Sequence, residues 1–102
     1  MNEEQRILIQ YRLDQAEESY QAALLLFNDE KFRPAINRAY YAMFYAVLAL
    51  LVTGSNPASK HSGVISFFDR EYIKTGVFDT QFSKWMHEAF DLRQRVDYTE
   101  LF

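Results

Sequence analysis

The chain has 102 residues and a mass of 12.1 kDa, which allows one domain, residues 1–102, built around a single small core. Its formal charge of −3 and its pI near 5.3 exclude a globally basic nucleic-acid-binding protein, but they leave room for a local basic patch. The absence of cysteine excludes disulfides and thiolate metal sites.

The aromatic content of 17% predicts more apolar surface than one small domain can bury, and therefore an oligomer. The first residues are acidic and do not resemble a signal peptide, so we expect a cytoplasmic protein. The longest apolar run, residues 40–53, is about a dozen residues long, short of the roughly 20 that cross a bilayer, so no membrane span is expected.

Four helices are predicted in chain order. Residues 3–28 form the first, with an apolar seam of Ile9, Leu13, Ala16, Tyr20, Ala23 and Phe27. The second follows the polar link 28–31, carries Pro34 in its first turn and stops at residues 54–57. Its alanines at 35, 39, 42, 46 and 49 form a narrow seam that lets a neighbouring helix approach closely.

The third predicted helix is capped by Ser59 and ends at Gly76, with Val64, Phe67, Phe68 and Tyr72 as its apolar side. Asp79 caps the fourth, whose apolar stripe is Phe82, Trp85, Met86, Ala89, Phe90 and Leu92, continued by Arg93 and Val96. Short links between four helices predict an all-α, antiparallel up-down bundle.

Arginine and tyrosine are concentrated at two places: Arg38, Tyr41 and Tyr45 on the second helix, and Arg93, Arg95, Asp97 and Tyr98 at the end of the fourth. Arginine binds phosphate bidentately and tyrosine stacks on bases, so this set is a candidate nucleotide or RNA site. The alternative is a structural network in which Asp97 or Asp91 pairs with an arginine.

Other chemistry is poorly supported. The two histidines, His61 and His87, fall on different helices, and the one acid near ligand spacing is Glu88 beside His87, so we expect no metal. We expect His61 to face solvent or cap its helix. No glycine-rich phosphate loop is present and no serine has an organised base, so no cofactor is expected.

Three segments, 37–46 (NRAYYAMFYA), 60–68 (KHSGVISFF) and 89–98 (AFDLRQRVDY), together resemble the HEPN domain family, in particular its small stand-alone prokaryotic branch. The resemblance implies a helical homodimer, often encoded beside a minimal nucleotidyltransferase. Members of this kind usually carry one more helix after the Asp-Tyr segment, so we expect that last helix to be absent here, with the apolar residues 98–102 covered by another element or chain.

Some family members are RNA-cleaving toxins of toxin–antitoxin pairs, in which an Arg is followed after about four to six residues by a catalytic His at the dimer interface. Here Arg93 takes the Arg position, but Tyr98 follows where a His is expected, so the resemblance leaves open whether the chain is an enzyme. In some relatives a nearby tyrosine accepts a nucleotide from the partner transferase, and Tyr98 is the candidate.

Three functions follow from these residues. The first is a HEPN-type dimer that partners a minimal nucleotidyltransferase and binds nucleotide or RNA phosphate near Arg93, with Arg38, Tyr41, Arg95 and Asp97 around it. The second is a metal-independent endoribonuclease toxin that uses Arg93 and Tyr98. The third is a scaffold that retains only dimerisation.

Overall fold

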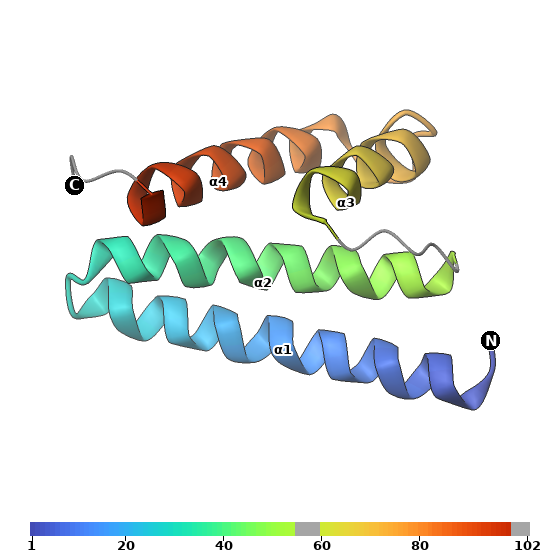
Figure 1. Ribbon diagram of the computed structural model, residues 1–102, viewed down its shortest axis with the longest axis horizontal. Helices are drawn as coiled ribbons and strands as arrows, with labels where there is room; N and C mark the ends of the chain where they lie inside the picture. The colour runs from blue at the N-terminus through green and yellow to red at the C-terminus, as the bar shows by residue number, and fades with distance from the viewer. Residues whose placement is uncertain (55–59, 99–102) are drawn as a thin grey trace.

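A computed structural model describes residues 1–54 and 60–98. Its elements are α1 (Glu3–Asn28), α2 (Phe32–Thr53), α3 (His61–Phe68), a π-helical turn η1 (Asp69–Ile73) and α4 (Thr80–Tyr98). Helix α2 lies in the middle, with α1 along one side and α3 and α4 along the other (Figure 1). The predicted all-α fold with four helices is confirmed.

Helix α1 begins with a capping box that the sequence analysis did not single out. The Asn2 side chain accepts a hydrogen bond from the Gln5 amide at 2.8 Å, and the Gln5 side chain accepts one from the Asn2 amide at 3.0 Å. These bonds satisfy two of the amide donors that a helix start leaves unpaired. The predicted start of the first helix is therefore confirmed.

The seam predicted for α1 is partly wrong. Ala23 is buried and Ile9 and Ala16 are half-buried, but Leu13, Tyr20 and Phe27 are exposed. The only helix that α1 contacts among the described elements is α2, so only a narrow line of its surface is covered. The two fully buried residues of that line, Ser19 and Ala23, are small.

The alanine seam of α2 is also only partly covered. Ala35 and Ala49 are buried, Ala42 and Ala46 are half-buried, and Ala39 is exposed. An apolar groove of about 350 Å³ runs between α1 and α2 at this point, lined by Tyr20, Ala23, Leu24, Phe27, Phe32, Ala35, Ile36 and Ala39. The two helices therefore do not close tightly along the whole seam.

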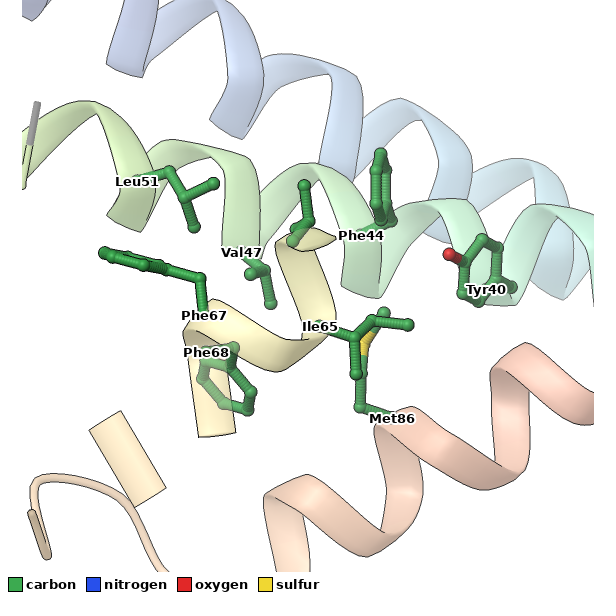
Figure 2. Packing of buried hydrophobic residues seen from close by; sticks show 9 residues of the cluster. Tyr40, Phe44, Val47, Leu51, Ile65, Phe67, Phe68 and Met86 are labelled. Atoms are coloured by element: carbon green, nitrogen blue, oxygen red, sulfur yellow. The ribbon is translucent and has the colours of Figure 1, made fainter. Parts of the chain in front are cut away.

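The core lies on the opposite side of α2, where α3 and α4 cover it. It consists of nine buried side chains, Tyr40, Phe44, Val47, Leu51, Val64, Ile65, Phe67, Phe68 and Met86 (Figure 2). The apolar side predicted for the third helix is confirmed, since Val64, Phe67 and Phe68 are buried and Tyr72 is half-buried. This packing fixes the distance and register between α2 and α4.

The third helix finishes as the π-helical turn η1 and not as a continuous α-helix. Gly76 follows with φ of 81°, the left-handed conformation predicted for it. Asp69 at the start of η1 accepts hydrogen bonds from Ser83 at 2.7 Å and lies 2.6 Å from Nε2 of His87. These contacts hold η1 against α4. The predicted cap Ser59 lies outside the described residues.

Helix α4 begins as predicted, with Asp79 accepting a hydrogen bond from the Gln81 amide at 2.8 Å. Its stripe is only partly covered: Met86 and Val96 are buried, and Ala89, Phe90 and Arg93 are half-buried, whereas Phe82, Trp85 and Leu92 are exposed. Of the chain end expected to need a cover, Tyr98 is 71% exposed and residues 99–102 lie outside the described residues.

Helix α2 is the one described helix that is long and apolar enough to cross a membrane, with a mean hydropathy of 1.5 over its most apolar window. The helix has 22 residues, longer than the apolar run 40–53, because it also includes the more polar residues 32–39. Its position between α1 on one side and α3 and α4 on the other is that of the core helix of a compact domain (Figure 1).

Candidate functional site

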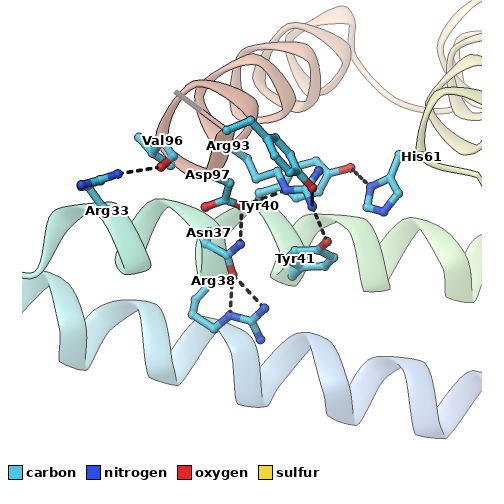
Figure 3. A network of polar contacts seen from close by, with 10 residues as sticks. Arg33, Asn37, Arg38, Tyr40, Tyr41, His61, Arg93, Val96 and Asp97 are labelled. Atoms are coloured by element: carbon cyan, nitrogen blue, oxygen red, sulfur yellow. Dashed lines mark hydrogen bonds and ion pairs between the residues drawn. The ribbon is translucent and has the colours of Figure 1, made fainter. Parts of the chain in front are cut away.

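Arg93 lies at the centre of a polar network between α2 and α4 (Figure 3). Its Nε donates to Asp97 at 3.1 Å, and its Nη2 donates to the hydroxyls of Tyr41 at 2.9 Å and Tyr98 at 3.1 Å. The Arg93 side chain is only 12% exposed. The guanidinium is thus held in one orientation by a carboxylate and two phenols.

Aromatic rings surround the same guanidinium. Its carbon lies 5.7 Å from the ring centre of Tyr40, 5.3 Å from that of Tyr41 and 5.1 Å from that of Tyr98. Ring faces attract cations, so these contacts stabilise the charge where water is scarce. The fourth position after Arg93 is Asp97, which completes an ion pair across one helical turn.

Part of Arg93 remains free for a ligand. Within residues 1–54 and 60–98, the other terminal nitrogen, Nη1, makes no hydrogen bond. No buried side-chain nitrogen or oxygen in those residues lacks a partner, so Nη1 reaches solvent. An oriented guanidinium with one open donor is suited to a phosphate oxygen.

Two further arginines, Arg33 and Arg38, bond to neighbours of Asp97. Its Oδ2 also accepts from Asn37 Nδ2 at 2.7 Å, and Asn37 Oδ1 in turn accepts from Arg38 Nε at 3.0 Å and Nη2 at 2.8 Å. Arg33 donates to the carbonyl of Val96 at 3.2 Å, near the C-terminal end of α4. The network therefore holds three guanidinium groups and one carboxylate, a local excess of positive charge.

Tyr40 and His61 extend the network to α3. The Tyr40 hydroxyl lies 2.7 Å from Nδ1 of His61, whose ring stacks on Phe44 at 4.3 Å between centres. Burial raises the pKa of the Tyr40 phenol well above its usual range. Burial, and next the charge of Arg93, lower the pKa of His61.

His61 corrects an expectation. We predicted that it would face solvent or cap its helix, but its ring is half-buried and bonded to Tyr40. The reason is the aromatic surface of Tyr40 and Phe44, on which a flat imidazole packs well. Sequence reasoning missed Tyr40 and His61 as site residues; the only sequence signal was their shared presence in the segments that carry the family resemblance.

The other predicted site residues divide into two groups. Arg38, Tyr41, Arg93, Asp97 and Tyr98 come together, and Asp97, not Asp91, pairs with Arg93. Arg95 is exposed and takes part in none of the contacts described above. Arg38 bonds to the neutral side chain of Asn37 and stacks over the Tyr41 ring at 5.0 Å.

The described residues contain no group of three His, Asp or Glu side chains that could hold a metal ion. The chemistry on offer is that of guanidinium, phenol, imidazole and carboxylate groups. Such groups bind anions by charge and hydrogen bonding, and they exchange protons.

The structure is thus a small helical domain with a network of arginine and tyrosine side chains between α2 and α4. The chain belongs to the HEPN domain family, which matches residues 9–102. It is 43% identical to a UPF0332 protein of Thermotoga maritima over 99% of this chain and 76% of that protein.

Two relatives from Methanocaldococcus jannaschii carry the name "Putative toxin". One, MJ0142, is 42% identical over 84% of this chain and 58% of its own length. The other, MJ0605, is 35% identical over 97% of this chain and 74% of its own length. The chain thus spans between about half and three quarters of these relatives.

Proposed function

We propose that this protein binds a phosphate group of a nucleotide or RNA at the Arg93 network, and that it acts in the cytoplasm as the HEPN partner of a minimal nucleotidyltransferase. The observation that carries the phosphate site is the guanidinium of Arg93, which Asp97, Tyr41 and Tyr98 hold in place while Nη1 reaches solvent. A donor oriented before binding loses little entropy when the phosphate arrives.

Charge and aromatic surface nearby support the same function. Arg38 lies on the flank of the network, where it can attract a second phosphate. Tyr98 is 71% exposed and offers a ring face on which a base can stack. Its hydroxyl, 3.1 Å from Arg93, is the candidate acceptor of a nucleotidyl group in the partner transferase's reaction: the phenol oxygen would bond to the α-phosphorus of a nucleoside triphosphate, and pyrophosphate would leave.

Binding of a short fluorescent RNA and of ATP, measured at several salt concentrations, tests the phosphate site. Arg93→Lys keeps the charge but loses the planar fork, so we expect about tenfold weaker binding. Arg38→Ala should weaken RNA binding by about threefold. It should also reduce the slope of log affinity against log salt concentration by about 0.7 for each lost phosphate contact. Arg6→Ala, an exposed arginine in the first turn of α1, is the matched control.

Thermal unfolding of each variant separates lost binding from lost folding. Weaker binding by Arg38→Ala and Arg93→Lys, with Arg6→Ala equal to the wild type, supports the site. Equal affinity of all four folded proteins contradicts it.

The homodimer and the transferase partnership rest on the family and on exposed apolar surface. Among the described elements, helix α1 contacts α2 alone, and it exposes Ile7, Leu8, Tyr11, Leu24 and Leu25. Light scattering after gel filtration should give twice the chain mass. Leu25→Glu should shift this mass to that of a monomer, whereas Gln94→Glu, the same added charge on α4, should not.

Co-expression with a minimal nucleotidyltransferase from the same genome should yield a complex that survives gel filtration.

A metal-independent endoribonuclease is the second candidate, because an imidazole, that of His61, lies in the same network as Arg93. Two relatives named as toxins point the same way. Purified protein should then cleave total or tRNA-rich RNA without metal, and Arg93→Ala should abolish cleavage while Tyr98→Phe tests the phenol. Intact RNA and unimpaired growth on overexpression would contradict the nuclease function, and phosphate binding would remain as the proposed function.

A further inference from the structure

His61 and Arg93 lie against the same pair of tyrosines. Tyr40 bonds to His61 through its hydroxyl and faces the Arg93 guanidinium with its ring, at 5.7 Å. Tyr41 accepts a hydrogen bond from Arg93 and meets the His61 ring edge-on, at 5.8 Å between centres. The α3 imidazole and the α4 guanidinium are thus held by one aromatic surface of α2 (Figure 3).

The hydrogen bond to Tyr40 decides which nitrogen of His61 carries the proton. Tyr40 is fully buried, and His61 Nδ1 is the one hydrogen-bond partner of its hydroxyl within the described residues. A buried hydroxyl that donates to nothing is costly, so the Tyr40 O–H donates and Nδ1 accepts. A neutral imidazole that accepts at Nδ1 carries its proton on Nε2.

The Nε2 atom is also available to a ligand. It makes no hydrogen bond within residues 1–54 and 60–98, and no buried side-chain nitrogen there lacks a partner, so Nε2 reaches solvent. Burial and the nearby Arg93 charge both lower the pKa of His61, which keeps the ring neutral at neutral pH. The site therefore presents one cationic donor, Arg93 Nη1, and one neutral donor, His61 Nε2–H.

We propose that His61 is a second phosphate-binding residue of the Arg93 site, donating a hydrogen bond from Nε2–H to a phosphate oxygen of the nucleotide or RNA. This inference rests on the proposed phosphate function of Arg93 and extends it to α3. Tyr40 acts as a positioning residue, since it fixes the tautomer and orientation of His61 without reaching the ligand.

Two substitutions of His61 and one control substitution of His87 test the role of the Nε2 donor. His61→Phe keeps a flat ring against Phe44 but removes the donor, and it should weaken binding of adenosine monophosphate and of a short RNA by about tenfold. His61→Gln, whose amide places an N–H near the Nε2 position, should retain most of the affinity. His87→Phe removes the other histidine, outside this network, and should bind as the wild type does.

The titration of His61 separates a binding role from a structural one, because a purely structural role would leave the pKa of His61 independent of the ligand. The titratable and charged groups that face its ring are Tyr40 and Tyr41 from α2 and Arg93, paired with Asp97, from α4. A bound phosphate adds negative charge, so the pKa of His61 should rise when the ligand is present. The proton signals of the two histidines in an NMR titration, with His87→Gln used for assignment, measure this rise.

The outcomes separate this inference from the function on which it rests. Weaker binding by His61→Phe, rescue by His61→Gln and a rise in the pKa of His61 support it, and the stronger of the two probes identifies nucleotide or RNA as the ligand. If Arg93→Lys weakens binding while His61→Phe binds normally, the role of His61 is wrong and the Arg93 site stands. If the wild type binds neither probe, both proposals are overturned.

Discussion

The hydroxyl of Tyr40 and Nδ1 of His61 lie 2.7 Å apart, although 21 positions of sequence separate the two residues. The bond joins the middle of α2 to the first residue of α3. Phe44 reinforces it, because the His61 ring stacks on Phe44 at an interplanar angle of 12°. The start of α3 is thus fixed to the core by one hydrogen bond and by ring contacts with Tyr40, Tyr41 and Phe44.

Removal of the Tyr40 hydroxyl should weaken this junction. Tyr40→Phe keeps the ring in the core and deletes only the donor, so the free energy of unfolding should fall by about 1 kcal/mol. Urea unfolding measures the change, and Tyr11→Phe on the exposed side of α1 is the control. An unchanged denaturation midpoint for Tyr40→Phe would show that the hydroxyl bond adds no net stability.

The stability of the protein should depend on pH through His61. Its pKa is lower in the folded protein than in the unfolded chain, so the unfolded chain binds more protons near and below the unfolded pKa. The stabilising contribution is therefore complete above about pH 6.5 and is lost as the pH falls through the folded pKa. Unfolding at about pH 7.5 and at about pH 5 should show a larger loss in the wild type than in His61→Gln. Equal losses would contradict this role.

Two alanines of the α2 seam have opposite surroundings, so the same substitution should affect stability differently at each. Ala49 is 5% exposed, so Ala49→Leu should overfill the α2 packing and lower the free energy of unfolding by about 1 to 3 kcal/mol. Ala39 faces the open groove between α1 and α2, where the added carbons of Ala39→Leu find space. Chemical denaturation should show a clear loss for the first variant and no loss, or a gain, for the second. Equal losses would mean that the groove closes in solution.

Asp69 should stabilise the contact between η1 and α4. Its carboxylate contacts both Ser83 and His87, so Asp69→Ala should cost about 1 to 2 kcal/mol of unfolding free energy. A double-mutant cycle with Ser83→Ala measures the coupling in this part of the structure. Strictly additive effects of the two substitutions would indicate that the Ser83 bond contributes nothing.

The sequence predicted contacts within one helix better than contacts between helices. Arg93 and Asp97 are four residues apart on a helix, and their pairing follows from that spacing. The bond from Arg93 to Tyr41 spans 52 positions and depends on how α4 lies along α2, which periodicity does not encode. The same limit explains His61: its environment is created by Tyr40 and Phe44, two residues from another helix.

The error on α1 has a different cause. Leu13 and Tyr20 repeat with helical spacing just as core residues do, yet both are exposed because α2 is the one described helix that packs against α1. Periodicity identifies an apolar stripe but does not say how many helices will cover it. For α2, with neighbours on both sides, apolar pattern and burial agree much better.

The attachment of α1 to α2 alone separates two kinds of surface in this protein. No residue of α1 belongs to the Arg93 network, and no described helix other than α2 touches α1. Substitutions on the outer face of α1 can therefore accumulate without altering the geometry of the Arg93 network. Descendants of this protein could change the partner that contacts α1 while they keep the polar network on α2, α3 and α4. The surface of α1 and the residues of the network are therefore free to evolve at different rates.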